Sequence, residues 1–170
     1  MERSPRGAPA LPAQDPAEGP GAERGHAARE YRHTFTVPPT PESTRVARQQ
    51  VRETLRRWDV DDTTEAADTV RLIVSELVTN AVQHAGHMTC SVAVTVMLDD
   101  SGDLLLGVRD GHPGLPTAQQ VPLLACSGRG MDIVRTLLHE AGGHCHIEPH
   151  QNGGKVVWIQ LSVTRRTPAT

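Results

Sequence analysis

Aromatic side chains are scarce in this 170-residue sequence, where Trp, Tyr and Phe together make up 2% of the residues. A hydrophobic core must therefore be built from Leu, Val, Ile and Ala packed at close density. No segment approaches the ~18 consecutive apolar residues of a membrane span, and the N-terminus lacks the apolar run of a secretory signal. Since the length suits one domain of ~100 to 200 residues, we expect a single soluble, cytoplasmic domain that does not contact membranes.

Excess positive charge is also missing, because the formal net charge is -3 and the pI is near 6.3. A small nucleic-acid-binding module needs a basic surface to meet the phosphate backbone, so nucleic acid is not an expected partner. The three cysteines are an odd number, which favours reduced thiols over a disulfide framework. The only lysine, Lys155, indicates a compositional preference for arginine, and we give it no functional weight.

Hydrophobic patterning divides the chain into a tail, a domain and a second short tail. Residues 1–30 are rich in Ala, Pro, Gly and charged side chains, and they cannot bury enough surface to offset the entropy of ordering, so we expect them to be disordered. Residues 31–164 carry the periodic segments and form the expected domain. Residues 165–170 form a short tail.

The domain alternates strand-like and helix-like segments. Alternation predicts strands over 31–37, 90–98 and 104–108, the last two forming a hairpin, and over 144–148 and 155–163. Apolar residues at helical spacing predict one helix from Ser43 or Thr44, either of which can cap it, to about Trp58. The same spacing predicts a second helix from Thr63 or Thr64 to Ala85, and a third after Gly130 that ends near residues 142–143.

Three polar features follow one another in an order that suits a nucleotide site. Glu76 and Asn80 lie one helical turn apart and project from one side, where a carboxylate can accept a proton and an amide oxygen can bind Mg²⁺. Such a pair alone is common on exposed helices. Asp110 follows a strand and precedes a loop rich in Gly and Pro, and the Gly-x-Gly of residues 128–130 precedes a helix whose first amides can receive phosphate.

Four segments carry a resemblance to a known superfamily: residues 74–85 (VSELVTNAVQHA), 108–116 (VRDGHPGLP), 128–134 (GRGMDIV) and 154–158 (GKVVW). They resemble the N, G1, G2 and closing boxes of the GHKL ATPases, over about residues 31–164. Within that superfamily the chain looks most like small stand-alone proteins related to bacterial anti-sigma-factor serine/threonine kinases. The resemblance implies an α+β fold, a two-layer α/β sandwich of the Bergerat type with helices on one face of a mixed β-sheet.

The resemblance also assigns roles to individual residues. Glu76 would be the general base that activates a Ser or Thr hydroxyl, Asn80 the Mg²⁺ ligand, and Asp110 the carboxylate that reads adenine. Residues 111–127 would form the lid over bound ATP. The remaining residues expected to bind the nucleotide are Gly114, Gly128, Arg129, Gly130 and Met131.

Two positions depart from the family pattern. His112 occupies the middle glycine of the Asp-x-Gly-x-Gly motif, which alters the expected adenine floor. Cys126 stands where the anti-sigma kinases have an arginine before the glycine turn, and Arg129 inside the turn is a candidate substitute for contact with the γ-phosphate, or else an exposed surface residue. These departures make ATP binding a firmer expectation than kinase activity.

The leading functional hypothesis is an ATP-binding regulatory protein, a Mg²⁺-dependent serine/threonine kinase that acts on an anti-anti-sigma-like (STAS) protein and so controls a sigma factor. The resemblance also implies a homodimer. One alternative is a nucleotide-binding anti-sigma or adaptor module without phosphoryl transfer, which would use the arginine-rich side of the helix over 43–58 to dock an acidic partner. A second alternative is a fold that has lost ATP binding.

Overall fold

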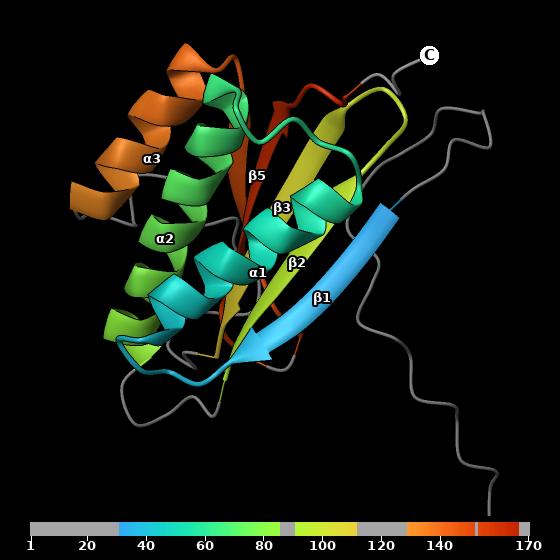
Figure 1. The fold of residues 1–170 in the computed structure, drawn as a ribbon. Helices are drawn as coiled ribbons and strands as arrows, with labels where there is room; N and C mark the ends of the chain where they lie inside the picture. Colours follow the sequence, from blue (N-terminus) through green and yellow to red (C-terminus); the bar gives the residue numbers. More distant parts are fainter. Residues whose placement is uncertain (1–30, 86–90, 112–128, 152, 167–170) are drawn as a thin grey trace, which may run out of the picture.

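The computed structural model describes residues 31–85, 91–111, 129–151 and 153–166, and the predicted tail over residues 1–30 lies outside them. The helices form one layer that covers one face of a β-sheet (Figure 1). This arrangement confirms the predicted α+β two-layer fold. The elements in chain order are β1 (Tyr31–Val37), α1 (Ser43–Arg57), α2 (Glu65–Ala85), β2 (Val92–Leu98), β3 (Asp103–Asp110), α3 (Arg129–Glu140), β4 (His144–Pro149) and β5 (Lys155–Ser162).

The five described strands lie in the order β1-β2-β3-β5-β4, and every pairing among them is antiparallel. The expectation of a mixed sheet was therefore wrong for the described strands. The connection from β3 through α3 brings β4 back to run in the same direction as β3, which would make a parallel pair if the two strands were neighbours. Instead β5 inserts between them and pairs antiparallel with each.

The core lies between the sheet and the helices and is almost wholly aliphatic, as the low aromatic content predicts. On β2, buried residues alternate with half-buried ones, as expected for a strand with one face against the helix layer. The facing stripe of α2 includes Val70, Val74, Leu77 and Ala81, all of which are buried. At full burial each aliphatic side chain contributes about 1.5 to 3 kcal/mol relative to an exposed one.

The two long helices begin differently from one another. Thr64 Oγ1 accepts a hydrogen bond of 3.3 Å from the backbone N–H of Ala67 and so caps α2, which begins at Glu65, one residue after the predicted start at Thr63 or Thr64. The predicted capping of α1 by Ser43 or Thr44 was wrong, because Ser43 is already helical and the N-cap residue is Glu42, which makes no side-chain cap. The Ser43 hydroxyl donates instead to the carbonyl oxygen of Pro38 and ties the helix to the preceding turn.

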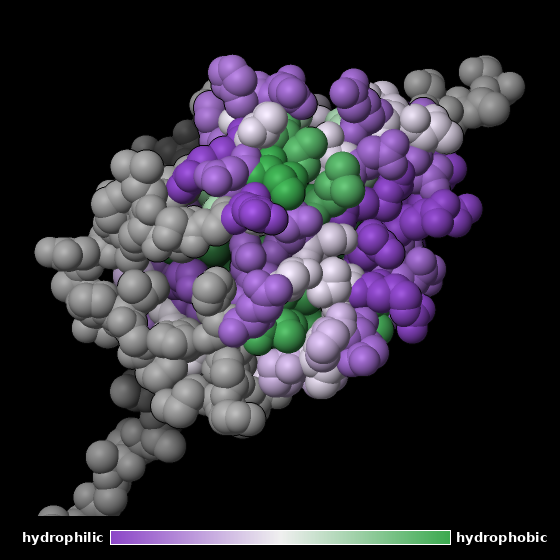
Figure 2. Space-filling model, turned by 90° about the vertical axis from the view of Figure 1, so that its left-hand side faces the viewer, coloured by the Kyte–Doolittle hydropathy of each residue, from purple (hydrophilic) through white to green (hydrophobic). Residues whose placement is uncertain are grey.

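The outer surface of the helix layer is mostly hydrophilic, with small separate hydrophobic patches (Figure 2). Among the described residues, the large hydrophobic side chains that are exposed are Val46, Leu72 and Ile133. Within the same part of the chain, no helix combines the length and apolar character needed to cross a membrane.

On the sheet face away from the helices, Trp158 of β5 lies over Gly107 of the neighbouring strand β3. The two residues are register partners, and a Cβ on Gly107 would lie 2.4 Å from the Trp158 ring. The indole N–H of Trp158 donates to Glu148 Oε2 at 3.1 Å, which holds the ring in this position. Gly107 is therefore required for space rather than for backbone conformation.

We predict that Gly107→Ala lowers the free energy of unfolding by about 1 to 3 kcal/mol, because the added methyl group displaces the indole. Urea denaturation of the variant and the parent protein measures this difference. In a Trp158→Ala background the same glycine substitution should cost much less, since nothing then occupies the space above residue 107. An equal loss in both backgrounds would contradict the steric explanation.

Candidate functional site

The polar strip of α2 lies beside its buried stripe, towards the C-terminal half of the helix. Glu76 and Asn80 are both half-buried, whereas Leu77 and Ala81 next to them are buried. The apolar stripe fixes the rotation of the helix against the sheet, so the two polar side chains must project to one side of the layer. That side is occupied by α3.

Glu76 and Asn80 converge on the first turn of α3, at Gly130. A Cβ on Gly130 would lie 2.8 Å from Glu76 Oε2, 3.1 Å from Asn80 Oδ1 and 3.2 Å from Asn80 Nδ2. A methyl group at this position would meet the ends of both side chains, so Glu76 and Asn80 would have to shift to admit it. The structure thus brings together three of the predicted site residues, which come from two separate motifs of the sequence.

The start of α3 places the remaining predicted residues of this segment in different environments. Arg129 and Gly130 already belong to the helix, whereas the sequence predicted that they precede it. The Arg129 side chain is exposed, and the Met131 side chain is buried in the core, so Met131 would offer only its backbone to a ligand. The first amides of a helix lack internal acceptors and carry partial positive charge, which favours an anion near this turn.

Asp110 is the last residue of β3 and one of the few buried polar residues, with 5% of its surface exposed. Its carboxylate is ion-paired with Lys155, the first residue of β5, with Nζ 2.6 Å from Oδ2. The backbone N–H of Lys155 also donates to Asp110 Oδ1 at 3.3 Å. Sequence reasoning found Asp110 but gave no weight to Lys155, because only the pairing of β3 with β5 makes the two residues neighbours.

The backbone beside this ion pair is fixed by Gly154. The residue has φ +81°, and a Cβ on it would lie 2.0 Å from the carbonyl oxygen of Asp110. Any other residue would force β5 away from the end of β3. The end of β3, the C-terminal half of α2 and the start of α3 lie at the same end of the molecule (Figure 1).

Several predicted features lie outside the described residues. They are Gly114 and Gly128 of the expected nucleotide site, the substituted positions His112 and Cys126, and the predicted lid from residue 112 onward.

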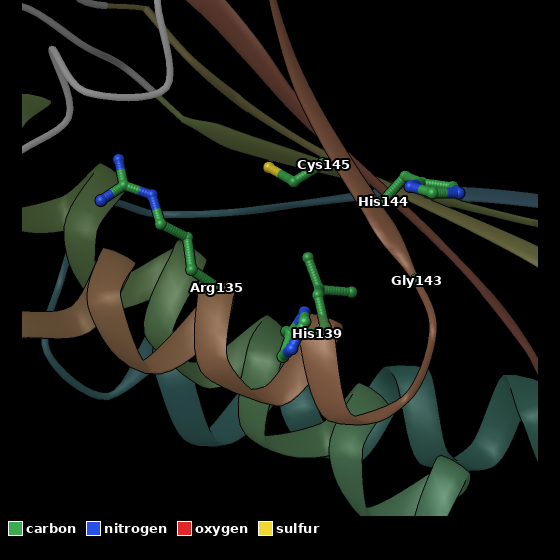
Figure 3. Close-up of a pocket in the computed structure, with 6 residues that line it drawn as sticks. Arg135, His139, Gly143, His144 and Cys145 are labelled. Atoms are coloured by element: carbon green, nitrogen blue, oxygen red, sulfur yellow. The ribbon is translucent and has the colours of Figure 1, made fainter.

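A hollow lies between α3 and the edge strand β4, and it contains none of the predicted site residues. Arg135, His139, His144 and Cys145 line it together with Leu138 and Gly143 (Figure 3). Its histidines come from different elements, and over the described ranges no group of three or more His, Cys, Asp or Glu is placed to hold a metal ion.

Comparison with known proteins points in the same direction as the geometry. A family model described as a histidine kinase-like ATPase domain matches residues 37–161. The chemotaxis protein CheA of Salmonella typhimurium is 37% identical over 68 residues, which are 40% of this chain and 10% of CheA. The chain therefore spans about a tenth of the curated relative that it matches.

Two solved structures are similar to this chain to different degrees. The RsbU and RsbW domains of Rv1364c from Mycobacterium tuberculosis match with a TM-score of 0.57 and 22% identity, over 82% of this chain and 34% of that one. This likeness shows the fold. The SiaB-SiaC complex from Pseudomonas aeruginosa gives a TM-score of 0.49 and 13% identity, over 78% of this chain and 89% of that one.

The turn between β4 and β5 carries a histidine, His150, whose surroundings lower its pKa. His150 Nε2 lies 3.1 Å from Nη1 of Arg109, and the backbone N–H of His150 donates to Gly154 at 2.9 Å. Burial, and then the charge of Arg109, lower the pKa of His150 below its ordinary value of 6.5. The folded protein thus holds a neutral imidazole at a pH where the unfolded chain would already bind a proton.

We predict that His150 stabilises the fold above pH 6.5 and that this contribution is lost as the pH falls towards its lowered pKa. The urea concentration at the midpoint of unfolding should decrease when the pH is lowered from 7.5 to 5.5. Arg109→Gln should make this decrease smaller, because removing the guanidinium brings the pKa of His150 back towards its ordinary value. A pH dependence that is the same with and without Arg109 would contradict the assignment.

Proposed function

Because the chain belongs to the histidine kinase-like ATPase domain family, whose model matches residues 37–161, we propose that it is a Mg²⁺-dependent serine/threonine protein kinase. Its substrate is an anti-anti-sigma-like (STAS) protein, and its phosphorylation controls a sigma factor. ATP is the ligand that membership of an ATPase family implies.

The observation that carries the proposal is the convergence of Glu76 and Asn80 on Gly130. The Glu76 carboxylate and the Asn80 amide lie against the first turn of α3. A side chain in place of Gly130 would push them away from this turn. The helix amides offer hydrogen bonds to phosphate oxygens, while the carboxylate and amide offer a proton acceptor and a cation ligand. This combination suits a terminal phosphoryl group better than a neutral ligand.

In the proposed reaction Glu76 acts on the hydroxyl group of the protein substrate. The hydroxyl oxygen bonds to the γ-phosphorus, its proton passes to the Glu76 carboxylate, and the bond to the β–γ bridging oxygen breaks as ADP leaves. Because the transition state is loose and its charge is spread over the phosphoryl oxygens, the chain contributes mainly by positioning and by charge stabilisation. The first-turn amides of α3 and the exposed Arg129 are the groups available to stabilise that charge.

The residues present also fit a magnesium ion. Asn80 Oδ1 is an oxygen ligand of the kind Mg²⁺ prefers, and it lies at the first turn of α3, next to Gly130. When bound, Mg²⁺ neutralises charge on the phosphate oxygens. Asn80 would hold the ion through Oδ1 and keep the phosphates beside the helix terminus.

At the other end of the nucleotide, Asp110 is suited to recognise the base. Its buried carboxylate can accept a hydrogen from the 6-amino group of adenine, which guanine replaces with an oxygen.

The alternative of an adaptor without phosphoryl transfer draws on α1. Arg52 and Arg56 of its basic side lie 3.5 and 3.6 Å from Asp62, so part of that side is occupied within the chain. Arg45 and Arg48 are exposed on the same helix and are the residues that an acidic partner would meet. The adaptor and the kinase therefore differ in their reaction and not in their fold.

Glu76→Gln separates the two functions. The amide keeps the shape of the side chain but cannot accept the proton, so we predict that phosphoryl transfer to the STAS substrate falls by a factor of about 10² or more. Affinity for ATP with Mg²⁺ should stay within about threefold of the parent protein, because the amide preserves the packing against Gly130. Transfer is measured with radiolabelled ATP on the STAS-domain proteins of the source organism, and affinity by calorimetry.

A matched control for this experiment is Glu140→Gln, which makes the same chemical change at the exposed end of α3 and should alter neither property. If the parent protein binds ATP but phosphorylates no STAS protein, the kinase is excluded and the adaptor is favoured. If it binds no ATP, the nucleotide site itself is excluded.

Gly130→Ala tests the convergence directly. The added methyl group pushes Glu76 and Asn80 away from α3, so we predict that affinity for ATP with Mg²⁺ falls at least about tenfold, which corresponds to roughly 1.4 kcal/mol. Thermal stability should not fall correspondingly, because alanine is favoured over glycine in a helix by ~1 kcal/mol. Calorimetry and thermal unfolding, run together, distinguish this result from a general loss of folding.

A further inference from the structure

The ion pair between Asp110 and Lys155 places a hydrogen-bond acceptor and a donor side by side at the end of the sheet. The two residues are directly opposite in the register of β3 and β5, with Nζ 2.6 Å from Oδ2. Their side chains are largely shielded, at 6% exposed for Asp110 and 16% for Lys155. An ammonium group carries three N–H donors, and the contact with Oδ2 takes one of them.

Burying such a pair is a weak route to stability, because desolvation of both charges offsets most of their attraction. The β3–β5 pairing does not depend on it either, since the register continues over eight residues of each strand. The position of Lys155 is fixed by the backbone, through the N–H that it donates to Asp110 Oδ1 and through the neighbouring Gly154. A rigidly held donor beside a rigidly held acceptor has the form of a recognition element.

We propose that Lys155 is a second base-reading residue, whose ammonium donates to N1 of adenine while Asp110 accepts from the 6-amino group. This inference rests on the proposed nucleotide site. Adenine presents a donor at its 6-amino group next to an acceptor at N1, which is the complement of the carboxylate and ammonium of the pair. Guanine in the same orientation would present O6 to the carboxylate and N1–H to the ammonium, so both contacts would be repulsive or unpaired.

A guanine shifted sideways by one position would instead place O6 on Lys155 and N1–H on Asp110. The adenine orientation is favoured because Asp110 is the more deeply buried of the two and is held at both oxygens, so its carboxylate is the better fixed acceptor for the 6-amino group. The two orientations make opposite predictions about preference for ATP and GTP.

The experiment compares three triphosphates by calorimetry in the presence of Mg²⁺: ATP, GTP and 1-deaza-ATP, in which a C–H group replaces N1. The parent protein should bind ATP at least about tenfold more tightly than 1-deaza-ATP, since the charge-assisted hydrogen bond to N1 is lost in the analogue. It should bind GTP weakly, because O6 and N1–H of guanine do not match the carboxylate and the ammonium. Lys155→Met should weaken ATP binding by a similar factor and leave the affinity for 1-deaza-ATP unchanged. Lys155→Arg keeps a donor and should recover part of the affinity for ATP.

The control is the effect on 1-deaza-ATP, because a purely structural lysine would weaken both adenine nucleotides equally when it is replaced. An equal loss, or tighter ATP binding by Lys155→Met, would overturn the inference. If Lys155→Met does not fold, the parent protein still decides the question, since equal affinity for ATP and 1-deaza-ATP, or for ATP and GTP, also overturns it. ATP binding without these differences would refute only the role of Lys155, whereas no binding of any triphosphate would refute the proposed nucleotide site.

Discussion

The burial of one stripe of α2 against the sheet is the constraint on which the candidate site depends. A helix has ~3.6 residues per turn, so once Val74, Leu77 and Ala81 are buried, the directions of the positions between them are fixed. Glu76 and Asn80 then point towards α3 because no other rotation of α2 keeps its apolar residues out of water. The polar geometry of the site is thus a consequence of aliphatic packing, whose free energy exceeds that of any single polar contact.

The parts of this structure that are local in sequence could be predicted from it. The periodicity of residues 70–82 predicted α2, and the short turn before Asp103 predicted the β2–β3 hairpin, because each pattern involves residues close along the chain. The sheet order could not be predicted in this way. Whether β3 lies next to β4 or β5 depends on packing between distant segments, and the same uncertainty hid Lys155, since its neighbour across the sheet is 45 positions away. The motif resemblance supplied Glu76 and Asn80 as candidates, but their contact with Gly130 required the relative placement of two helices.

Charge within the site is distributed unevenly, and this has consequences for an anionic ligand. Asp110 is neutralised by Lys155, so the lysine is committed to the end of the site where the base would lie and cannot also meet the phosphates. Glu76 adds a further negative charge near the start of α3. A triphosphate must therefore rely on the helix amides, on the exposed Arg129 and on a divalent cation for compensation. A nucleotide site on these residues should be strongly dependent on Mg²⁺, because without the cation the Glu76 carboxylate and the phosphates are left with too little positive charge.

Hydrophobic packing alone does not explain why residue 130, where Glu76 and Asn80 converge, is a glycine. Glycine is often needed for positive φ, as at Gly102 and Gly154, but Gly130 lies within a helix and needs no such conformation. In that setting alanine would be favoured by ~1 kcal/mol. Among the described residues, the nearest neighbours of a Cβ there are the Glu76 carboxylate and the Asn80 amide. Glycine at this position lets the two polar groups lie against the first turn of α3, although alanine would favour the helix itself.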